Sequence, residues 1–198
     1  MIDTAVEICN NALADIGITT AIASLNDDDV EGRLAGRYYP QQRDSLLAAF
    51  PWSFARRVAV LALSSEDPTS NWLYRYVEPE DCLKPREILH DSDTEDEPPF
   101  DREVNEDNNA VTILTDREEA SLVYTRRVEY PGMFPPEFIE ALQYALAAKF
   151  AMGIKNNIKL ARDFSTLSKN TALNAMGTDR SSVKEKRNHE PEWQKNRA

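Results

Sequence analysis

Apolar residues recur three and four positions apart near the N-terminus, the spacing that places them on one face of a helix. This pattern predicts a first helix that is capped by Asp3 or Thr4 and stops at Gly17. The acidic run 26–29 predicts the start of a second helix, because carboxylates favour the positive end of the helix dipole. The expected inward stripe of the second helix contains Val30, Leu34 and Tyr38.

The pattern changes from helix to strand after the second helix. Pro40 predicts a kink or a fresh first turn. Pro51 predicts the end of the helix at Phe50, because proline disfavours the α conformation in the residue before it. Trp52 and Phe54 follow at once and point to the same side of an extended segment. We expect both to be buried structural anchors, since large aromatic side chains at such a junction fill a core.

Short segments rich in branched and aromatic residues predict strands in the middle of the chain. They span 55–63, 71–77, 86–90, 102–104, 110–115 and 120–128, with a turn over 79–85. Trp72 begins a period-two pattern and is a third predicted anchor. The segments 102–104 and 110–115 are expected to form a hairpin, and the whole sheet an antiparallel meander.

Helical spacing returns after Pro135 and Pro136, which suit a helix start. It predicts one helix that ends or bends at Gly153 and another over 158–176 that Gly177 closes. The predicted fold class is therefore α+β: a bundle of N- and C-terminal helices with an inserted antiparallel β-sheet subdomain and a flexible C-terminal tail. The expected parts are 1–54 with 134–177 for the bundle, 55–133 for the subdomain and 178–198 for the tail.

The composition is that of a globular chain with a strong negative balance. Hydrophobic residues make up 41% and charged residues 29% of the 198 positions, and the formal net charge is −11. This balance opposes nucleic-acid binding, which needs cations at the phosphates, and suits a surface that repels DNA or one that keeps the protein soluble. Neither a signal peptide nor a membrane span is expected, because the chain has no basic N-terminal region followed by an apolar run and no apolar stretch of spanning length.

Catalytic and metal-binding motifs are scarce. The chain lacks the glycine-rich phosphate loops and the motifs of serine hydrolases and zinc proteases, and no cofactor or metal is predicted. Cys9 lies on an apolar helix face and is expected to be a small buried hydrophobic residue. His90 with Asp91 and Asp93 is the metal-binding alternative, although this run lacks the glycine and regular spacing of a hard-cation loop.

Two charged stretches lie outside the predicted elements. The first is an acidic loop, expected to face solvent, a channel or a partner, and it contains Asp91, Asp93, Glu95, Asp96 and Glu97. The second is the tail, where basic residues gather around one aromatic anchor: Arg180, Lys184, Lys186, Arg187, Trp193, Lys195 and Arg197. In an acidic chain this combination is typical of a docking segment, the alternative being a terminus without a role.

Several short motifs occur in an order that resembles one known family. They are Ala12-Leu13-Ala14-Asp15-Ile16-Gly17, Ser24-Leu25-Asn26-Asp27, Pro51-Trp52-Ser53-Phe54-Ala55-Arg56-Arg57, Trp72-Leu73-Tyr74-Arg75-Tyr76 and Pro79-Glu80-Asp81-Cys82-Leu83. In this order the chain resembles the tail tubular protein A family, the head-to-tail adaptors of short-tailed bacteriophages. The similarity extends over 4–175, is weakest in 91–109, and does not include the tail.

The resemblance implies a non-enzymatic structural protein of the virion, made in the host cytoplasm and placed at the head-tail junction. It implies a homo-oligomeric ring of about a dozen copies between the portal protein and the tail nozzle protein, with tail fibres as a further partner. DNA would pass through the channel without specific binding, and no membrane would be contacted. The charge and the aromatic anchor of the tail, and not the resemblance, lead us to expect that the tail docks on the portal.

Two alternatives to the adaptor stay open at this point. One is a tail-associated cell-wall-degrading enzyme, for which Glu78, Glu80 and Asp81 would supply the paired carboxylates of a glycosidase. The other is a generic tail-completion or interaction protein.

Overall fold

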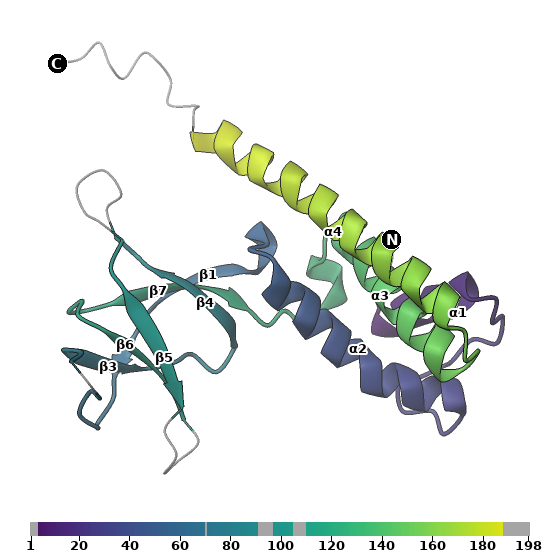
Figure 1. Cartoon of the computed structure of the whole chain (residues 1–198), viewed down its shortest axis with the longest axis horizontal. Helices are drawn as coiled ribbons and strands as arrows, with labels where there is room; N and C mark the ends of the chain where they lie inside the picture. Colours follow the sequence, from purple (N-terminus) through teal and green to yellow (C-terminus); the bar gives the residue numbers. More distant parts are fainter. Residues whose placement is uncertain (1–3, 70, 91–96, 105–109, 188–198) are drawn as a thin grey trace. The chain divides into compact units, whose positions relative to one another are not determined.

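The computed structural model divides the chain into two units (Figure 1). A helical unit comprises Met1–Phe54 and Val128–Ala198, and a sheet unit comprises Ala55–Arg127. The structure describes residues 4–69, 71–90, 97–104 and 110–187, with the backbone alone over 178–187. The predicted α+β class is confirmed, because helices from both ends of the chain pack together and antiparallel strands are inserted between them.

Helix α1 (Ala5–Asp15) has the predicted boundaries. Thr4 forms a capping box with Glu7: the Glu7 backbone N–H donates to the Thr4 hydroxyl, and the Thr4 N–H donates to the Glu7 carboxylate, both at 3.1 Å. Gly17, with φ of +76°, follows the end of the helix in the left-handed conformation that glycine adopts readily. Cys9 on the inner face is fully buried, as predicted.

Helix α2 (Val30–Ala49) starts at Asp29, which accepts a hydrogen bond from the Gly32 N–H. The helix ends before the extended residue Phe50, as Pro51 predicts, but it continues through Pro40, so no new first turn begins there.

The predicted inward stripe of α2 is wrong by about one position. Val30 is exposed, Leu34 and Tyr38 are half-buried, and Ala35 and Tyr39 are the buried residues. The physical reason lies in the link that precedes α2. That link packs so closely on the helix that a side chain at Gly36 would overlap the Leu25 carbonyl oxygen. Because the link covers this side of α2, Ala35 and Tyr39 are buried in place of Leu34 and Tyr38.

Helices α3 (Pro136–Gly153) and α4 (Ile158–Arg187) form an antiparallel pair in the helical unit (Figure 1). The start of α3 at the proline pair and its end at Gly153 are as predicted. Asn156 turns the chain between the helices with a positive φ of 49°, and Asn157 caps α4 by accepting the Leu160 N–H. The predicted end of the last helix at Gly177 is wrong, because α4 continues to Arg187.

An aromatic cluster joins the two separate parts of the helical unit. The Trp52 ring meets the Phe138 ring edge-on at a centroid distance of 5.2 Å, and Phe54 lies 5.2 Å from the same ring. Phe134 completes the cluster at 4.8 Å from Phe138. The Trp52 indole N–H donates to the Leu46 carbonyl at 2.9 Å, so its polar atom is satisfied although the side chain is buried. The core that the two anchors fill is thus helical.

The sheet unit contains two antiparallel sheets. One has the strand order β1 (Arg56–Val60), β7 (Ser121–Arg126), β4 (Cys82–Ile88). The other has the order β2 (Ala62–Leu63), β3 (Tyr74–Val77), β6 (Val111–Thr115), β5 (Phe100–Val104). The predicted meander is wrong, because β1, β3 and β4 pair with strands far away in sequence. The predicted hairpin partners β5 and β6 do pair; the residues between them, 105–109, lie outside the described residues.

The first predicted strand is divided between both sheets. Leu61 stands between β1 and β2, is buried, and donates its N–H to the Ala120 carbonyl at 2.9 Å. It belongs to the core of this unit together with Tyr76, Cys82, Ile88, Ile113, Ala120, Leu122 and Tyr124. The turn expected over 79–85 is in part wrong, because β4 includes Pro85. An edge strand with register shifts tolerates proline there.

A buried cation ties a loop to the second sheet. The Arg75 guanidinium on β3 is 7% exposed and donates to Glu66 at 2.9 Å and to Glu103 on β5 at 2.6 Å. Thr69 donates to the same Glu103 carboxylate at 2.7 Å. These bonds, that of Thr69 first and that of Arg75 next, lower the pKa of Glu103.

The first stability prediction concerns the aromatic cluster. Trp52→Ala should lower the free energy of unfolding by about 3–5 kcal/mol, the usual cost of truncating a core aromatic. Trp52→Phe is the matched control, because it keeps an aromatic ring but loses the hydrogen bond to the Leu46 carbonyl. It should lower the free energy of unfolding by roughly 1 kcal/mol, the usual net contribution of one hydrogen bond. Urea unfolding measures both, and an unchanged midpoint for Trp52→Ala would show that the junction is not core.

The second prediction is a pH dependence. Because the folded state lowers the Glu103 pKa below its ordinary value of 4.5, ionised Glu103 stabilises the fold above that pH, and this contribution disappears as the pH falls through the folded-state pKa. Glu103→Gln should therefore be less stable than the parent at pH 7, with a difference that shrinks in acid. The exposed Glu118→Gln of the same unit is the control in thermal melts. A difference that persists unchanged at pH 3 would contradict this assignment.

Candidate functional site

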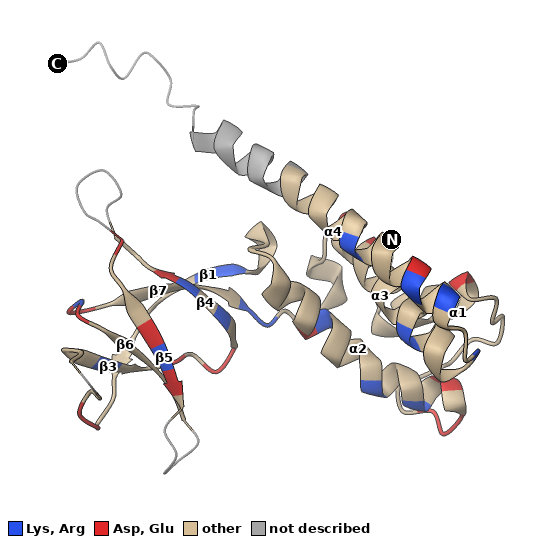
Figure 2. Cartoon of the chain, viewed as in Figure 1, with Lys and Arg blue, Asp and Glu red and all other residues tan. Residues whose placement is uncertain are grey.

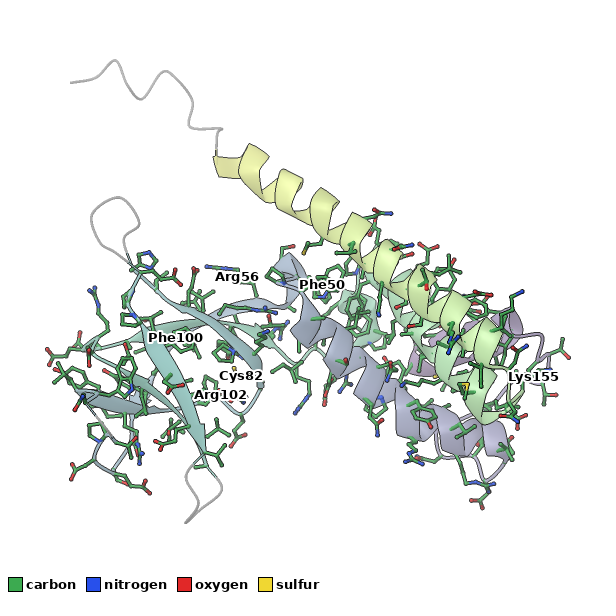
Figure 3. The ribbon with its side chains drawn as sticks, viewed as in Figure 1. Phe50, Arg56, Cys82, Phe100, Arg102 and Lys155 are labelled. Carbon is green, nitrogen blue, oxygen red and sulfur yellow. The ribbon has the colours of Figure 1, made fainter. Side chains whose placement is uncertain are left out.

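The candidate functional site is an open groove on the helical unit, lined by three helices. It has a volume of about 690 Å³. Its walls are the C-terminal part of α2, the C-terminal part of α3 and the N-terminal half of α4, and Phe50 at the end of α2 is labelled in Figure 3. The lining is mainly apolar, and three large apolar residues at the groove are about half exposed: Met152 at 44%, Ile158 at 55% and Leu173 at 51%.

Small side chains create the groove. Ala145 and Ala148 on α3 face Ala161, Ser165 and Ala172 on α4. Ser168 on α4 donates its hydroxyl to the Ala141 carbonyl at 2.8 Å, which fixes the register of the two helices at close approach. Because both helices carry small residues here, their side chains do not fill the space beside the line of contact, and a channel remains. The groove is therefore a direct result of how α3 and α4 pack.

The charged groups at the groove are all basic. Lys149, Arg162 and Lys169 line it, and none of the lining residues is acidic. Within the described part of the chain, no ion pair is recorded for these three cations. Figure 2 shows lysines and arginines in blue on the N-terminal part of α4. In a chain with a net charge of −11, this is a locally positive site.

The structure places the predicted site residues in separate regions. Trp52 is buried in the helical unit, Phe54 is half-buried beside it, and Trp72 is half-buried just before β3 in the sheet unit. Of the acidic loop, Glu97 is exposed, and 91–96 lie outside the described residues.

The predicted docking tail is described only in part. Its members on the final turns of α4, where the backbone alone is described, are Arg180, Lys184, Lys186 and Arg187. Its members outside the described residues are Trp193, Lys195 and Arg197. The first half of the tail thus has a helical backbone continuous with a wall of the groove.

Two of the three carboxylates of the enzyme alternative, Glu78 and Asp81, are engaged in ion pairs, whereas Glu80 is exposed. Glu78 accepts two hydrogen bonds from the Arg102 guanidinium, both at 2.7 Å, and the side chain is 5% exposed. Asp81 accepts bonds from Arg57 and from the Tyr124 hydroxyl, both at 2.8 Å. Because arginine pairs with Glu78 and with Asp81, these two carboxylates act as structural acceptors in the sheet unit.

The two cysteines are buried thiols in different units. Burial raises the pKa of Cys9 to about 12, and burial followed by the charge of Glu78 raises the pKa of Cys82 to about 12. Figure 3 shows Cys82 and Arg102 as neighbours in the sheet unit. Thiols that stay protonated near neutral pH are weak nucleophiles and weak metal ligands.

The predicted metal-binding alternative centres on His90. His90 lies with Nδ1 at 3.1 Å from the Ile88 carbonyl, and its expected partners Asp91 and Asp93 fall outside those ranges. Among described residues, no group of three His, Cys, Asp or Glu side chains is arranged to hold a metal ion. In the same part of the chain, no helix combines the length and apolarity needed to cross a bilayer.

The sequence carried a partial signal for the groove. The stripe expected on the last helix has eight members, of which three do not line the groove: Phe164, Leu167 and Ala175. The other five do line it: Ile158, Ala161, Ser165, Ser168 and Ala172. The spacing identifies them as one face. It does not distinguish a face covered by a neighbouring helix from one that stays half open, because that depends on where α2 ends relative to α4.

The chain was compared with known proteins. No model of a protein family and no curated protein sequence matches it.

The third prediction tests whether the groove is surface or core. Ile158→Ser and Leu173→Ser should each change the free energy of unfolding by less than about 1 kcal/mol, because both side chains are already half exposed. Leu142→Ala on α3, fully buried, is the contrasting variant and should lose about 2–5 kcal/mol. Chemical denaturation compares them. Equal losses for all three variants would mean that the groove is closed in the folded protein.

Proposed function

We propose that this protein is a structural head-to-tail adaptor of a short-tailed phage particle. The observation that carries the proposal is the apolar groove of the helical unit, because exposed apolar surface in a strongly charged chain is typical of a protein-protein interface. The order of motifs that resembles tail tubular protein A gives this interface its biological setting. The site is proposed to bind protein and to carry out no reaction.

In the proposed assembly, about a dozen copies form a closed ring, with neighbouring copies in contact through their helical units. The ring lies between the portal protein and the tail nozzle protein, and tail fibres are a further proposed partner. The acidic loop, which includes Glu97, is proposed to face the channel or a partner. There, negative charge would let DNA pass without binding, because phosphates are repelled.

The C-terminal tail is proposed to dock on the portal. It combines six basic residues with Trp193 in an acidic chain, and its first part extends α4 to Arg187. A basic segment favours contact with an acidic neighbour, and tryptophan is a common anchor in an apolar pocket. Each contact is expected to be weak alone, and the ring makes attachment firm because many contacts act together.

The enzyme alternative receives less support from the geometry. A glycosidase needs two carboxylates that face a shared space for substrate. Glu78 and Asp81 instead face arginines, and the groove is lined without any carboxylate. The alternative of a generic tail-completion protein shares the groove argument with the adaptor, and only the identity of the partner separates the two.

The fourth prediction tests the adaptor proposal by mixing the protein with purified portal rings of the same phage. The full chain should comigrate with the rings in size-exclusion chromatography. A chain ending at Arg187 should keep its thermal stability, because α4 stays complete, and should bind portal roughly tenfold or more weakly. Trp193→Ala should show part of this loss, and Trp193→Phe should retain most of the binding.

The binding results test the adaptor role and the docking role of 188–198 separately. If the full chain does not bind portal, the adaptor proposal fails. If the shortened chain binds as well as the full chain, the adaptor role stands and the docking role of 188–198 is wrong.

A further inference from the structure

We propose that the groove of the helical unit is the binding site for an acidic amphipathic helix of a partner protein. The groove is a site separate from the end of the C-terminal tail, 188–198. It rests on the dimensions, the backbone chemistry and the charge of the groove, and it does not depend on the phage setting.

The dimensions fit about four helical turns. The groove follows α4 from Ile158 to Leu173, which at ~1.5 Å per residue corresponds to about 22 Å of helix. Its lining includes several alanines and serines, and such small residues let a further helix approach to the usual interaxial distance of about 8–10 Å. Met152, Ile158 and Leu173 then supply the larger apolar contacts at the edges.

The backbone chemistry selects a helix as occupant. The walls are three helices, whose backbone N–H and C=O groups are bonded within each helix. An extended peptide would bring unpaired backbone groups against apolar side chains and find no sheet edge to pair with. A helix satisfies its own backbone and can bury an apolar stripe at no such cost, which is the groove-binding mode common to amphipathic segments.

The charge selects an acidic occupant. Lys149, Arg162 and Lys169 stand at the groove without a recorded carboxylate partner among the described residues. Arg162 and Lys169 lie seven residues apart on α4, two turns along the same face. Glutamates spaced seven apart beside an apolar stripe would meet both cations. The same cations disfavour the basic end of this chain, 178–187, taken from a second copy.

The experiment uses the full chain and two synthetic helical peptides. Each peptide has 15 residues with one stripe of leucine and alanine, flanked in the first by glutamate and in the second by lysine. Fluorescence anisotropy at low salt should show the glutamate peptide binding at least about tenfold more tightly than the lysine peptide. The preference should decrease as salt rises, because exposed ion pairs are screened.

Charge reversal on α4 provides the decisive variant. Arg162→Glu with Lys169→Glu should reverse the preference, so that the lysine peptide binds more tightly. The matched control is Lys155→Glu with Lys159→Glu, which makes the same change in net charge on exposed positions outside the groove and should leave the preference intact. Lys169→Gln should give a smaller loss for the glutamate peptide and guards against a folding defect in the double variant.

Several results would overturn the inference. Equal binding of both peptides, or no binding of either, would reject an acidic helix as occupant. Binding that appears only after removal of 188–198 would make the chain's own end the occupant. A change of mass in solution caused by the α4 reversal alone would assign the groove to a second copy. None of these results affects portal attachment through the tail, so the adaptor proposal is tested separately.

Discussion

The contact of Trp52 with Phe138 is the interaction on which the rest of the structure depends. Trp52 lies just before the chain enters the sheet unit, and Phe134 and Phe138 lie just after it returns. The helical unit is built from two stretches separated by the whole of that insertion, and this cluster packs the end of one against the start of the other. With the Trp52 indole bonded to the Leu46 carbonyl, the end of α2 is fixed relative to the start of α3. The groove follows from that placement, because α2 and α3 form two of its walls.

Charge is distributed differently in the two units. In the sheet unit the arginines are used internally: Arg57 with Asp81, Arg75 with Glu66 and Glu103, and Arg102 with Glu78. Arg75 is buried, and removing both of its carboxylates would leave a buried charge without a partner, which costs free energy. On α4 the cations at the groove have no such partner in the described chain. This combination of apolar surface and basic groups without an ion pair among the described residues is the basis of the proposed docking site.

The proposed roles of α4 link packing to function. Its first half packs on α3 through small residues and leaves the groove open, and its second half continues past the helix end that Gly177 predicts. In an adaptor the two halves would meet different partners, an acidic helix at the groove and the portal at the C-terminal end. Glycine lowers helix stability by roughly 1 kcal/mol relative to alanine, so Gly177 locally disfavours the helix between these halves.

The sequence by itself determined the elements whose signals are local. The Thr4 cap, the stop at Gly17, the break at Phe50–Pro51 and the start of α3 each depend on a few neighbouring residues, and the structure has them all. Only the tertiary structure decided the remainder. The division of the first strand at Leu61, the pairing of β7 with both β1 and β4, and the buried side of α2 depend on residues far apart along the chain. The groove belongs to this second class, because periodicity marks one face of α4 but the position of α2 leaves that face half open.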